Sequence, residues 1–502
     1  MLPSLLYSGA KPKHPAMFDN REDLVKDLGM ESVISAMGRG VPAIMDTARA
    51  TLFESPAVDC GKIPFRQRII KDAISNRHIF LELYELTAAS VSKYEEARLK
   101  SQPGYARVAP VTLRIRTACE LLGILITLAD RVRITLEKID AGAVSAGLSA
   151  YIREFKAFYS KNFIASACRE IENVGRISEG AGLKLGVRIG NGMKGSKYAI
   201  RSVNQPVFMK RAAKRKGAAF VLDTFQQQFK ALELRDAAVH KLLNIMNAVV
   251  LQTADDLKTL YYELGFYVGC MNLIESVEGL GLPVCFPTEV KDGSDALAFD
   301  GLVDISLALS RNVLPVPNSV NMDGVRLTVV TGANQGGKST FLRSVGCAQL
   351  MAQCGMFVTA RELLFCARPR IFTHFCKPED AAMNSGKLDE ELVRLGFIVD
   401  RLVPESILLM NESFSSTAEL EGAAIAREVI GAFRETRVKV IFVTHLYDFA
   451  RSVELSNATD SDALFLRAER RDDGSRTYML KKGFSLPTSY GMDLFNELFP
   501  ES

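Results

Sequence analysis

Residues 325–354 read VRLTVVTGANQGGKSTFLRSVGCAQLMAQC and carry the strongest structural signal in the chain. The first part is an apolar, β-branched run, which predicts a buried β-strand. The pattern breaks at Gly332 and continues from Lys338 with the apolar spacing of a helix. Strand, loop and helix in this order, with a loop that matches G-x-x-x-x-G-K-[ST], predict a phosphate-binding loop. The plain alternative is a glycine-rich strand-to-helix turn that binds nothing.

Each residue type in this loop suits a triphosphate. The three glycines let the backbone curl so that successive N–H groups face the phosphates, and the helix N-terminus adds its positive end. We expect Lys338 to reach the β- and γ-phosphates and Ser339 to ligate Mg²⁺. The predicted nucleotide-binding residues of the loop are Gly332, Asn334, Gly336, Gly337, Lys338, Ser339 and Thr340.

Composition sets the broad class of the protein. The chain has 502 residues, 48% of them hydrophobic, which is enough to build two or more domains. Its nine cysteines are scattered without a C-x-x-C pair, so neither a zinc site nor a disulfide framework is indicated. No apolar run approaches 18 residues, and the N-terminus has no basic stretch followed by an apolar core. We therefore expect a cytoplasmic protein without a membrane span.

The formal net charge of +4 is distributed very unevenly. Residues 180–222 contain no Asp or Glu, and the rest of the chain carries −6. The ten basic residues of this segment are Lys184, Arg188, Lys194, Lys197, Arg201, Lys210, Arg211, Lys214, Arg215 and Lys216. Positive charge gathered in one short segment is typical of contact with phosphate backbones, so we predict that these residues bind nucleic acid. The alternative is a solvated surface loop.

Helical patterns surround the basic segment. Residues 21–100 are mostly helical in pattern, and residues 108–172 and 219–268 form long helical tracts. The two tracts predict an antiparallel pair of arms with the basic segment at the tip. The tip is rich in glycine, which predicts short strands and turns there.

The second half of the chain has a different pattern. A stretch rich in Gly, Pro and polar residues at 279–300 marks a boundary. Beyond it, the apolar runs at 406–410 and 438–444 predict buried parallel strands, with a helix at 419–433 between them. With the strand before the phosphate-binding loop, these elements predict an α/β nucleotide-binding domain.

Polar residues follow the two later strands directly. Asn411 and Glu412 stand where P-loop ATPases place acids that hold Mg²⁺ and orient the attacking water. Glu412 can act as the base, although a surface carboxylate is the plain alternative. Asn411 can accept a bond from a metal-bound water but supplies no charge. His445 ends the next strand and can sense the γ-phosphate.

Several of these segments together resemble the ATPase domain of the MutS mismatch-repair family. They are residues 331–375, 408–422, 441–449 and 478–498, and the likeness covers roughly Pro315 to Phe499. More weakly, Pro56, Asp59, Ile63, Arg66 and Gln67 resemble the start of the family's helical core, and the arms with their basic tip resemble its levers and clamp. The resemblance implies ATP and Mg²⁺ as cofactors, a homodimer and DNA as the partner.

Three features depart from the family pattern. The chain begins in the helical core, so direct reading of mismatches is not expected. Asn411 stands where the family has Asp. The family also places a Ser that reaches the partner subunit's nucleotide; Ser385 is the candidate here, although the ungapped register falls on Gly386.

Together these observations predict a multidomain fold with α-helical parts followed by an α/β P-loop (ABC-type) ATPase domain. The expected divisions are a helical core at 1–107, lever arms at 108–278 with a clamp-like tip at about 180–217, and the ATPase domain at 279–502. The expected function is an ATP-switched dimer that holds duplex or branched DNA by its backbone, in DNA repair or recombination, with hydrolysis at the dimer interface. A ligand of structured RNA or a ribosome, and a non-hydrolysing scaffold, remain alternatives.

Overall fold

The computed structural model describes all residues except 1, 9–16, 55–60, 101–110, 179–182, 190–194, 204–224, 292–294, 377–385, 461, 472–474 and 487–502. Within its helices and strands, the side chains of residues 98–100, 111–112, 176–178, 183–189, 195–203, 225–239 and 457–460 are not described. The chain divides into two compact units. Unit 1 comprises Met1–Leu5 and Asn76–Leu264, and unit 2 comprises Leu6–Ser75 and Gly265–Ser502.

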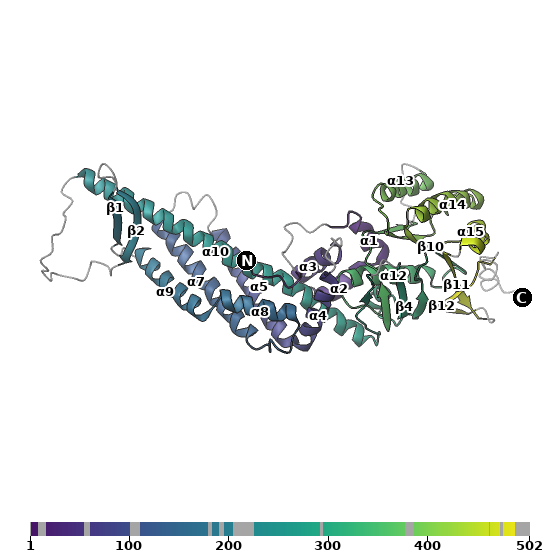
Figure 1. Cartoon of the computed structure of the whole chain (residues 1–502), viewed down its shortest axis with the longest axis horizontal. Coiled ribbons are helices and arrows are strands. Elements are labelled where there is room, and N and C mark those ends of the chain that lie inside the picture. Colours follow the sequence, from purple (N-terminus) through teal and green to yellow (C-terminus); the bar gives the residue numbers. More distant parts are fainter. Residues whose placement is uncertain are drawn as a thin grey trace, which may run out of the picture. The chain divides into compact units, whose positions relative to one another are not determined.

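Unit 1 consists of long helices and one small sheet (Figure 1). Its elements are α5 (Arg77–Lys100), α7 (Val111–Leu136), α8 (Ala146–Phe158), α9 (Lys161–Ser178), β1 (Leu183–Ile189), β2 (Gly195–Val203) and the part of α10 (Phe225–Gly279) that precedes residue 265. The predicted helical tracts on both sides of the basic segment are confirmed, but the first is broken at residues 137–145 and 159–160.

Side-chain contacts join the helices of unit 1. α7 packs against both α5 and α9. The rings of Tyr84 and Tyr261 stack with centroids 5.1 Å apart and connect α5 to α10. β1 and β2 pair antiparallel, with Lys184 opposite Ser202, so the strands predicted within the basic segment are confirmed.

Unit 2 combines helices with two sheets. Its helices are α1 (Arg21–Leu28), α2 (Met30–Gly38), α3 (Pro42–Leu52), α4 (Lys62–Ser75), the end of α10, α11 (Ile305–Arg311), α12 (Lys338–Gln353), α13 (Lys387–Val399), α14 (Glu419–Glu435) and α15 (Tyr447–Asp460). Local signals set several boundaries: Gly29 ends α1 at φ +66°, Pro42 opens α3, and the Asp304 carboxylate caps α11.

The larger sheet of unit 2 has six strands in the order β12-β11-β6-β10-β9-β8. These are β6 (Leu327–Thr331), β8 (Ile371–Phe375), β9 (Ile407–Asn411), β10 (Lys439–Val443), β11 (Ala463–Arg470) and β12 (Arg476–Lys482). All neighbouring pairs are parallel except β11 and β12. A four-stranded sheet, β3-β7-β4-β5, contains β3 (Thr288–Glu289), β4 (Leu297–Leu302), β5 (Asn318–Asn321) and β7 (Glu362–Phe365). The predicted α/β organisation is thus confirmed.

Helices cover both faces of the six-stranded sheet. The side chains of Leu327, Met410 and Phe442 share one buried core with residues of α13, α14 and α15. α12 packs against β9 and β10. At Gly346 of α12 a Cβ atom would lie 2.5 Å from the Leu28 side chain and 2.7 Å from the Leu409 side chain, so an added methyl group would force these leucine side chains to shift.

The N-terminal helices belong to the same unit as the sheet. α1 packs against α12 and β8. Arg66 of α4 is fully buried and donates to the carbonyl oxygen of Cys354 (3.3 Å), directly after α12, and to the Glu54 carboxylate (2.8 Å). Residues 6–75 therefore cluster with residues 265–502, whereas the sequence suggested a separate helical core at 1–107.

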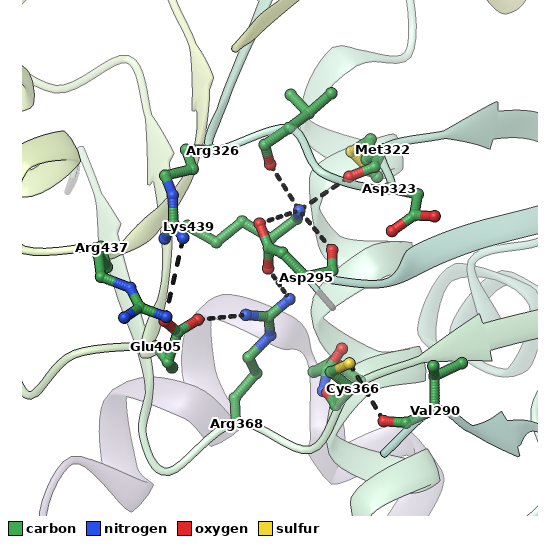
Figure 2. Close-up of polar contacts among 12 residues, drawn as sticks. Val290, Asp295, Met322, Asp323, Arg326, Cys366, Arg368, Glu405, Arg437 and Lys439 are labelled. Atoms are coloured by element: carbon green, nitrogen blue, oxygen red, sulfur yellow. Dashed lines mark hydrogen bonds and ion pairs between the residues drawn. The ribbon is translucent and has the colours of Figure 1, made fainter. Parts of the chain in front are cut away.

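A buried ionic network connects the two sheets of unit 2 (Figure 2). Lys439, at the start of β10, donates to the Asp295 carboxylate (3.0 Å) and to the carbonyl oxygens of Met322 (2.9 Å) and Val325 (2.6 Å). Arg368 pairs with the same Asp295 carboxylate. Burial lowers the pKa of Lys439 to about 8, and the nearby carboxylate opposes this effect, so the lysine is charged at neutral pH.

Two expectations from composition concern the described residues. All eight cysteines in the described part of the chain are free thiols, and Cys60 lies outside it. Among the helices that the structure describes, none combines the length and the apolar character needed to cross a bilayer.

We predict that Lys439→Met lowers the free energy of unfolding of unit 2 by about 3 kcal/mol or more, because Asp295 and two carbonyl oxygens lose a buried cation. Lys481→Met is the matched control, since Lys481 pairs with Glu469 but keeps 62% of its side chain exposed. The control should change stability by less than about 1 kcal/mol. Chemical denaturation followed by circular dichroism measures both, and equal small losses would contradict the prediction.

Candidate functional site

The predicted phosphate-binding loop lies between β6 and α12, so the predicted order of strand, loop and helix is confirmed. Gly332 and Gly337 have φ values of +113° and +93°, a region that L-residues with side chains rarely occupy. A Cβ atom at Gly332 would lie 2.9 Å from the backbone nitrogen of Ala468, and one at Gly336 would lie 2.8 Å from the Cβ of Ala468. The loop is therefore packed closely against β11, and this packing as well as its curvature requires glycine.

Lys338 is the first residue of α12 and its side chain turns back into the loop. Its Nζ donates to the carbonyl oxygens of Gly332 (2.8 Å) and Ala333 (2.9 Å). Burial lowers the pKa of Lys338 to about 8, and the Glu412 carboxylate acts in the opposite direction. The loop thus holds a largely buried cation at the N-terminus of a helix, which is where anions bind most readily.

Ser339 and Asn411 meet although 72 positions separate them in the sequence. The Ser339 hydroxyl donates to the side-chain oxygen of Asn411 at 2.8 Å. Asn411 is the last residue of β9, so the sheet brings the strand end to the loop. Both side chains offer neutral oxygens, which are suitable but weak ligands for a divalent cation. In the part of the chain that the structure describes, no group of three or more His, Cys, Asp or Glu residues could hold a metal ion by itself.

Glu412 and His445 form a direct pair that the sequence did not predict. The Glu412 Oε1 lies 3.1 Å from the His445 Nε2. The hydrogen bond from His445 lowers the pKa of Glu412, and burial opposes this effect. The backbone of Glu412 is left-handed (φ +56°) and its N–H donates to the Val443 carbonyl oxygen at 2.8 Å. The carboxylate is therefore ionised at neutral pH and fixed by two neighbouring strands.

A cavity of about 400 Å³ opens beside the loop. Its lining includes the polar side chains of Asn334, Lys338, Ser339 and Glu412. The apolar part of the lining, with one tyrosine, includes Leu302, Leu307, Leu314, Pro315, Val316 and Tyr478. A cavity whose lining combines a cation with apolar side chains fits a ligand that carries both phosphates and a flat ring.

Tyr478 and the segment Leu314–Val316 were not predicted as site residues. Tyr478 lies on β12. The Asn318 side chain donates to the Tyr478 carbonyl oxygen (3.4 Å) and accepts from the Leu480 N–H (2.7 Å), and Arg476 of β12 donates to the Gln335 side chain of the loop (2.9 Å). No spacing in the sequence indicates these contacts. The proline-containing apolar segment was a weak signal that could have suggested one wall of the cavity.

The other predicted site residues differ in how far the structure describes them. Asn334, Gly336, Gly337, Ser339 and Thr340 all line the cavity. Ser385 lies outside the described residues, and Gly386 is the residue before α13. Of the basic residues, Lys184 and Arg188 lie on β1, and Lys197 and Arg201 lie on β2. The remaining six lie outside the described residues: Lys194, Lys210, Arg211, Lys214, Arg215 and Lys216.

Two regions of the chain match known protein families. Residues 58–280 match the family described as MutS2 N-terminal domain, and residues 328–499 match MutS domain V. The second region contains the loop, Asn411, Glu412 and His445. The first contains unit 1 from Asn76 onward.

Individual relatives are similar over shorter stretches. The chain is 32% identical over 142 residues to the DNA mismatch repair protein MutS of Syntrophomonas wolfei, a match that covers 28% of this chain and 16% of that protein. It is 30% identical over 178 residues to the protein of the same name from a Caulobacter species, covering 32% and 20%. It is also 30% identical over 181 residues to DNA mismatch repair protein MutS 2 of Halobacterium salinarum, covering 36% and 21%. The matches thus span about a fifth of these relatives.

The two matched regions lie in the expected order and together span most of the chain. Both carry the name MutS in their descriptions, as do these relatives. The chain belongs to the MutS family.

Proposed function

We propose that this chain binds ATP with Mg²⁺ in the cavity beside the phosphate-binding loop and hydrolyses it. The observation that carries the proposal is the convergence of Lys338, Ser339 and Glu412 on one cavity, from a glycine loop and the end of a parallel strand. Ligands in open α/β sheets bind at the carboxyl ends of the strands, and these residue types are the ones that phosphoryl transfer requires. The apolar side chains of the lining, with Tyr478, would contact the base.

Each polar residue has a proposed part. Lys338 would exchange its bonds to the loop carbonyls for bonds to phosphate oxygens. Ser339 and Asn411 would hold Mg²⁺, which supplies charge neutralisation between the phosphates; because both are neutral, phosphate oxygens and water must complete its ligand shell. Glu412 would orient the attacking water. A carboxylate with a lowered pKa is a weak proton acceptor, so its main effect is to orient the water and to interact electrostatically with it.

His445 has a different proposed part from the one that the sequence suggested. Its bond to Glu412 supports a role in orienting the carboxylate. The direct sensing of the γ-phosphate, which the sequence suggested, stays a prediction. A side chain at this place can both orient Glu412 and contact the γ-phosphate.

We further propose that the protein acts on DNA as a homodimer in the cytoplasm, in repair or recombination. The relatives named for DNA mismatch repair support a DNA ligand, and the ten basic residues between 180 and 222 support contact with a phosphate backbone. Ser385 is the proposed contact to the partner subunit's nucleotide. Structured RNA could contact the same basic residues, so the binding experiment below compares DNA with RNA.

The nucleotide site is tested by two substitutions with different expected results. Lys338→Ala should lose ATP binding because the phosphates lose their cation. Glu412→Gln should bind ATP but hydrolyse it at least about a hundredfold more slowly. Glu428→Gln, an exposed acid on α14, is the matched control and should leave turnover unchanged. Phosphate release and nucleotide binding are the measurements; turnover in the wild type no higher than in Glu412→Gln would favour the non-hydrolysing scaffold.

Dimerisation should depend on ATP. If two subunits share the nucleotide, Glu412→Gln should shift from monomer to dimer on addition of ATP and Mg²⁺, because it binds without turning over. Sedimentation velocity with and without nucleotide measures this shift, and Lys338→Ala is the control that should stay unchanged. A single species under both conditions, monomer or dimer, would contradict nucleotide-gated assembly.

The basic segment should bind nucleic acid with strong salt dependence. Changing the four basic residues on β1 and β2 (Lys184, Arg188, Lys197 and Arg201) to Ala should reduce the slope of log K against log salt by up to about 0.9 for each lost phosphate contact on duplex DNA. The control changes four exposed residues of unit 1 instead: Arg116, Lys138, Arg153 and Lys156. Their substitution should leave the slope unchanged.

Matched, mismatched and branched duplexes and structured RNA should be compared in the same assay. Contacts to the phosphate backbone position a protein without reading sequence. The affinity of the four-residue variant should therefore fall about equally for matched and mismatched duplexes. Loss of mismatch discrimination in this variant alone would show that the segment reads base or shape. An equal slope in both four-residue variants would mean that the nucleic acid binds elsewhere than at β1 and β2.

A further inference from the structure

The loop after Glu412 has an unusual backbone. Glu412 and Phe414 both have left-handed φ values, +56° and +63°, and neither is glycine. Such a conformation is unfavourable for residues other than glycine and persists only when the surroundings hold it. Phe414 is fully buried in the core beneath α13 and α14, so packing supplies part of the restraint.

The polar restraint comes from Glu391 on α13. Its carboxylate accepts the Phe414 N–H at 2.8 Å and the Ser416 hydroxyl at 3.1 Å. Glu391 is only 4% exposed, and none of the ion pairs among the described residues involves it. A buried carboxylate is costly unless hydrogen bonds satisfy it, so these two bonds hold Glu391 and the loop together.

A second set of contacts fixes Glu391 to the sheet. The His374 Nε2 lies 3.1 Å from the Glu391 carbonyl oxygen, and the His374 Nδ1 lies 2.7 Å from the Ser413 hydroxyl. Arg394, one turn further along α13, donates to the Phe375 carbonyl oxygen at 2.8 Å. β8, α13 and the loop 412–416 therefore form one connected group of buried polar contacts.

We propose that Glu391 is a positioning residue that holds the loop 412–416 in its left-handed conformation and so directs the Glu412 carboxylate. This inference rests on the proposed hydrolysis. Without Glu391, Phe414 can relax toward negative φ, and a rotation two residues away displaces Glu412 from His445. α13 begins at Lys387, so Glu391 lies little more than one helical turn from the start of that helix.

The inference is tested by Glu391→Ala and Glu391→Gln, with Glu428→Gln as the matched control. In Glu391→Ala, kcat should fall by about tenfold to a hundredfold, while KM for ATP changes less than about threefold, because the phosphate-binding loop is untouched. Gln retains an oxygen for the Phe414 N–H, so Glu391→Gln should recover kcat to within about threefold of the wild type. Should Ala impair folding, Glu391→Asp provides the same test with a carboxylate that is one methylene too short.

Hydrogen exchange separates this inference from the proposed ATPase. Amide exchange in a peptide covering residues 412–417 should be about tenfold faster or more in Glu391→Ala than in the wild type, with no change in a peptide from β6. Faster exchange in a protein without turnover would overturn the ATPase and support the positioning role. Unchanged exchange, or unchanged kcat in an active enzyme, would overturn the positioning role and leave the ATPase standing. Loss of stability spread evenly over unit 2 would also overturn it.

Discussion

The register of three parallel strands brings the site together. Val443 of β10 pairs with Val330 of β6 on one side and with Asn411 of β9 on the other. The three strands therefore end at the same level, so the residues that follow them lie close together. The phosphate-binding loop follows β6, Glu412 follows β9 and His445 comes shortly after β10. A slip of one residue in either pairing would turn every second side chain to the other face and separate these groups.

This arrangement also explains what the sequence could predict. The loop motif, the apolar strands and the polar residues at their ends are local features, and the structure confirms where the strands, the loop and the helix lie. The bond between Glu412 and His445 could not be predicted, because it depends on strand order. β10 comes later in the chain than β9 but lies between β9 and β6, and no local pattern records that order. Tyr478 escaped prediction for the same reason, since β12 is held beside the cavity by contacts with residues distant in the sequence, Asn318 and Gln335.

The division into units was harder to predict than the site. The sequence pattern of residues 21–100 is mostly helical, so it indicated a single helical core. The structure separates α4 from α5 because their partners differ: Arg66 of α4 bonds to the end of α12, whereas α5 packs against α7. A fully buried guanidinium is costly unless every donor has an acceptor. Arg66 has acceptors in Leu6, Cys354 and Glu54, which ties the N-terminal helices firmly to unit 2.

These contacts mean that α12 is held at both ends, by different groups. Its N-terminus carries the phosphate-binding loop, whose lysine is held by the loop's own carbonyls. Its C-terminus is held by a buried arginine, a cation at the negative end of the helix dipole. Between them, Gly346 lets α12 pack closely against the Leu28 side chain of α1 and the Leu409 side chain of β9. The loop after Glu412, by contrast, is held in an unfavourable backbone conformation by a few buried polar contacts. The two sides of the proposed site are thus held differently: α12 by contacts at both ends, and the loop after Glu412 by the packing of Phe414 and by hydrogen bonds to Glu391.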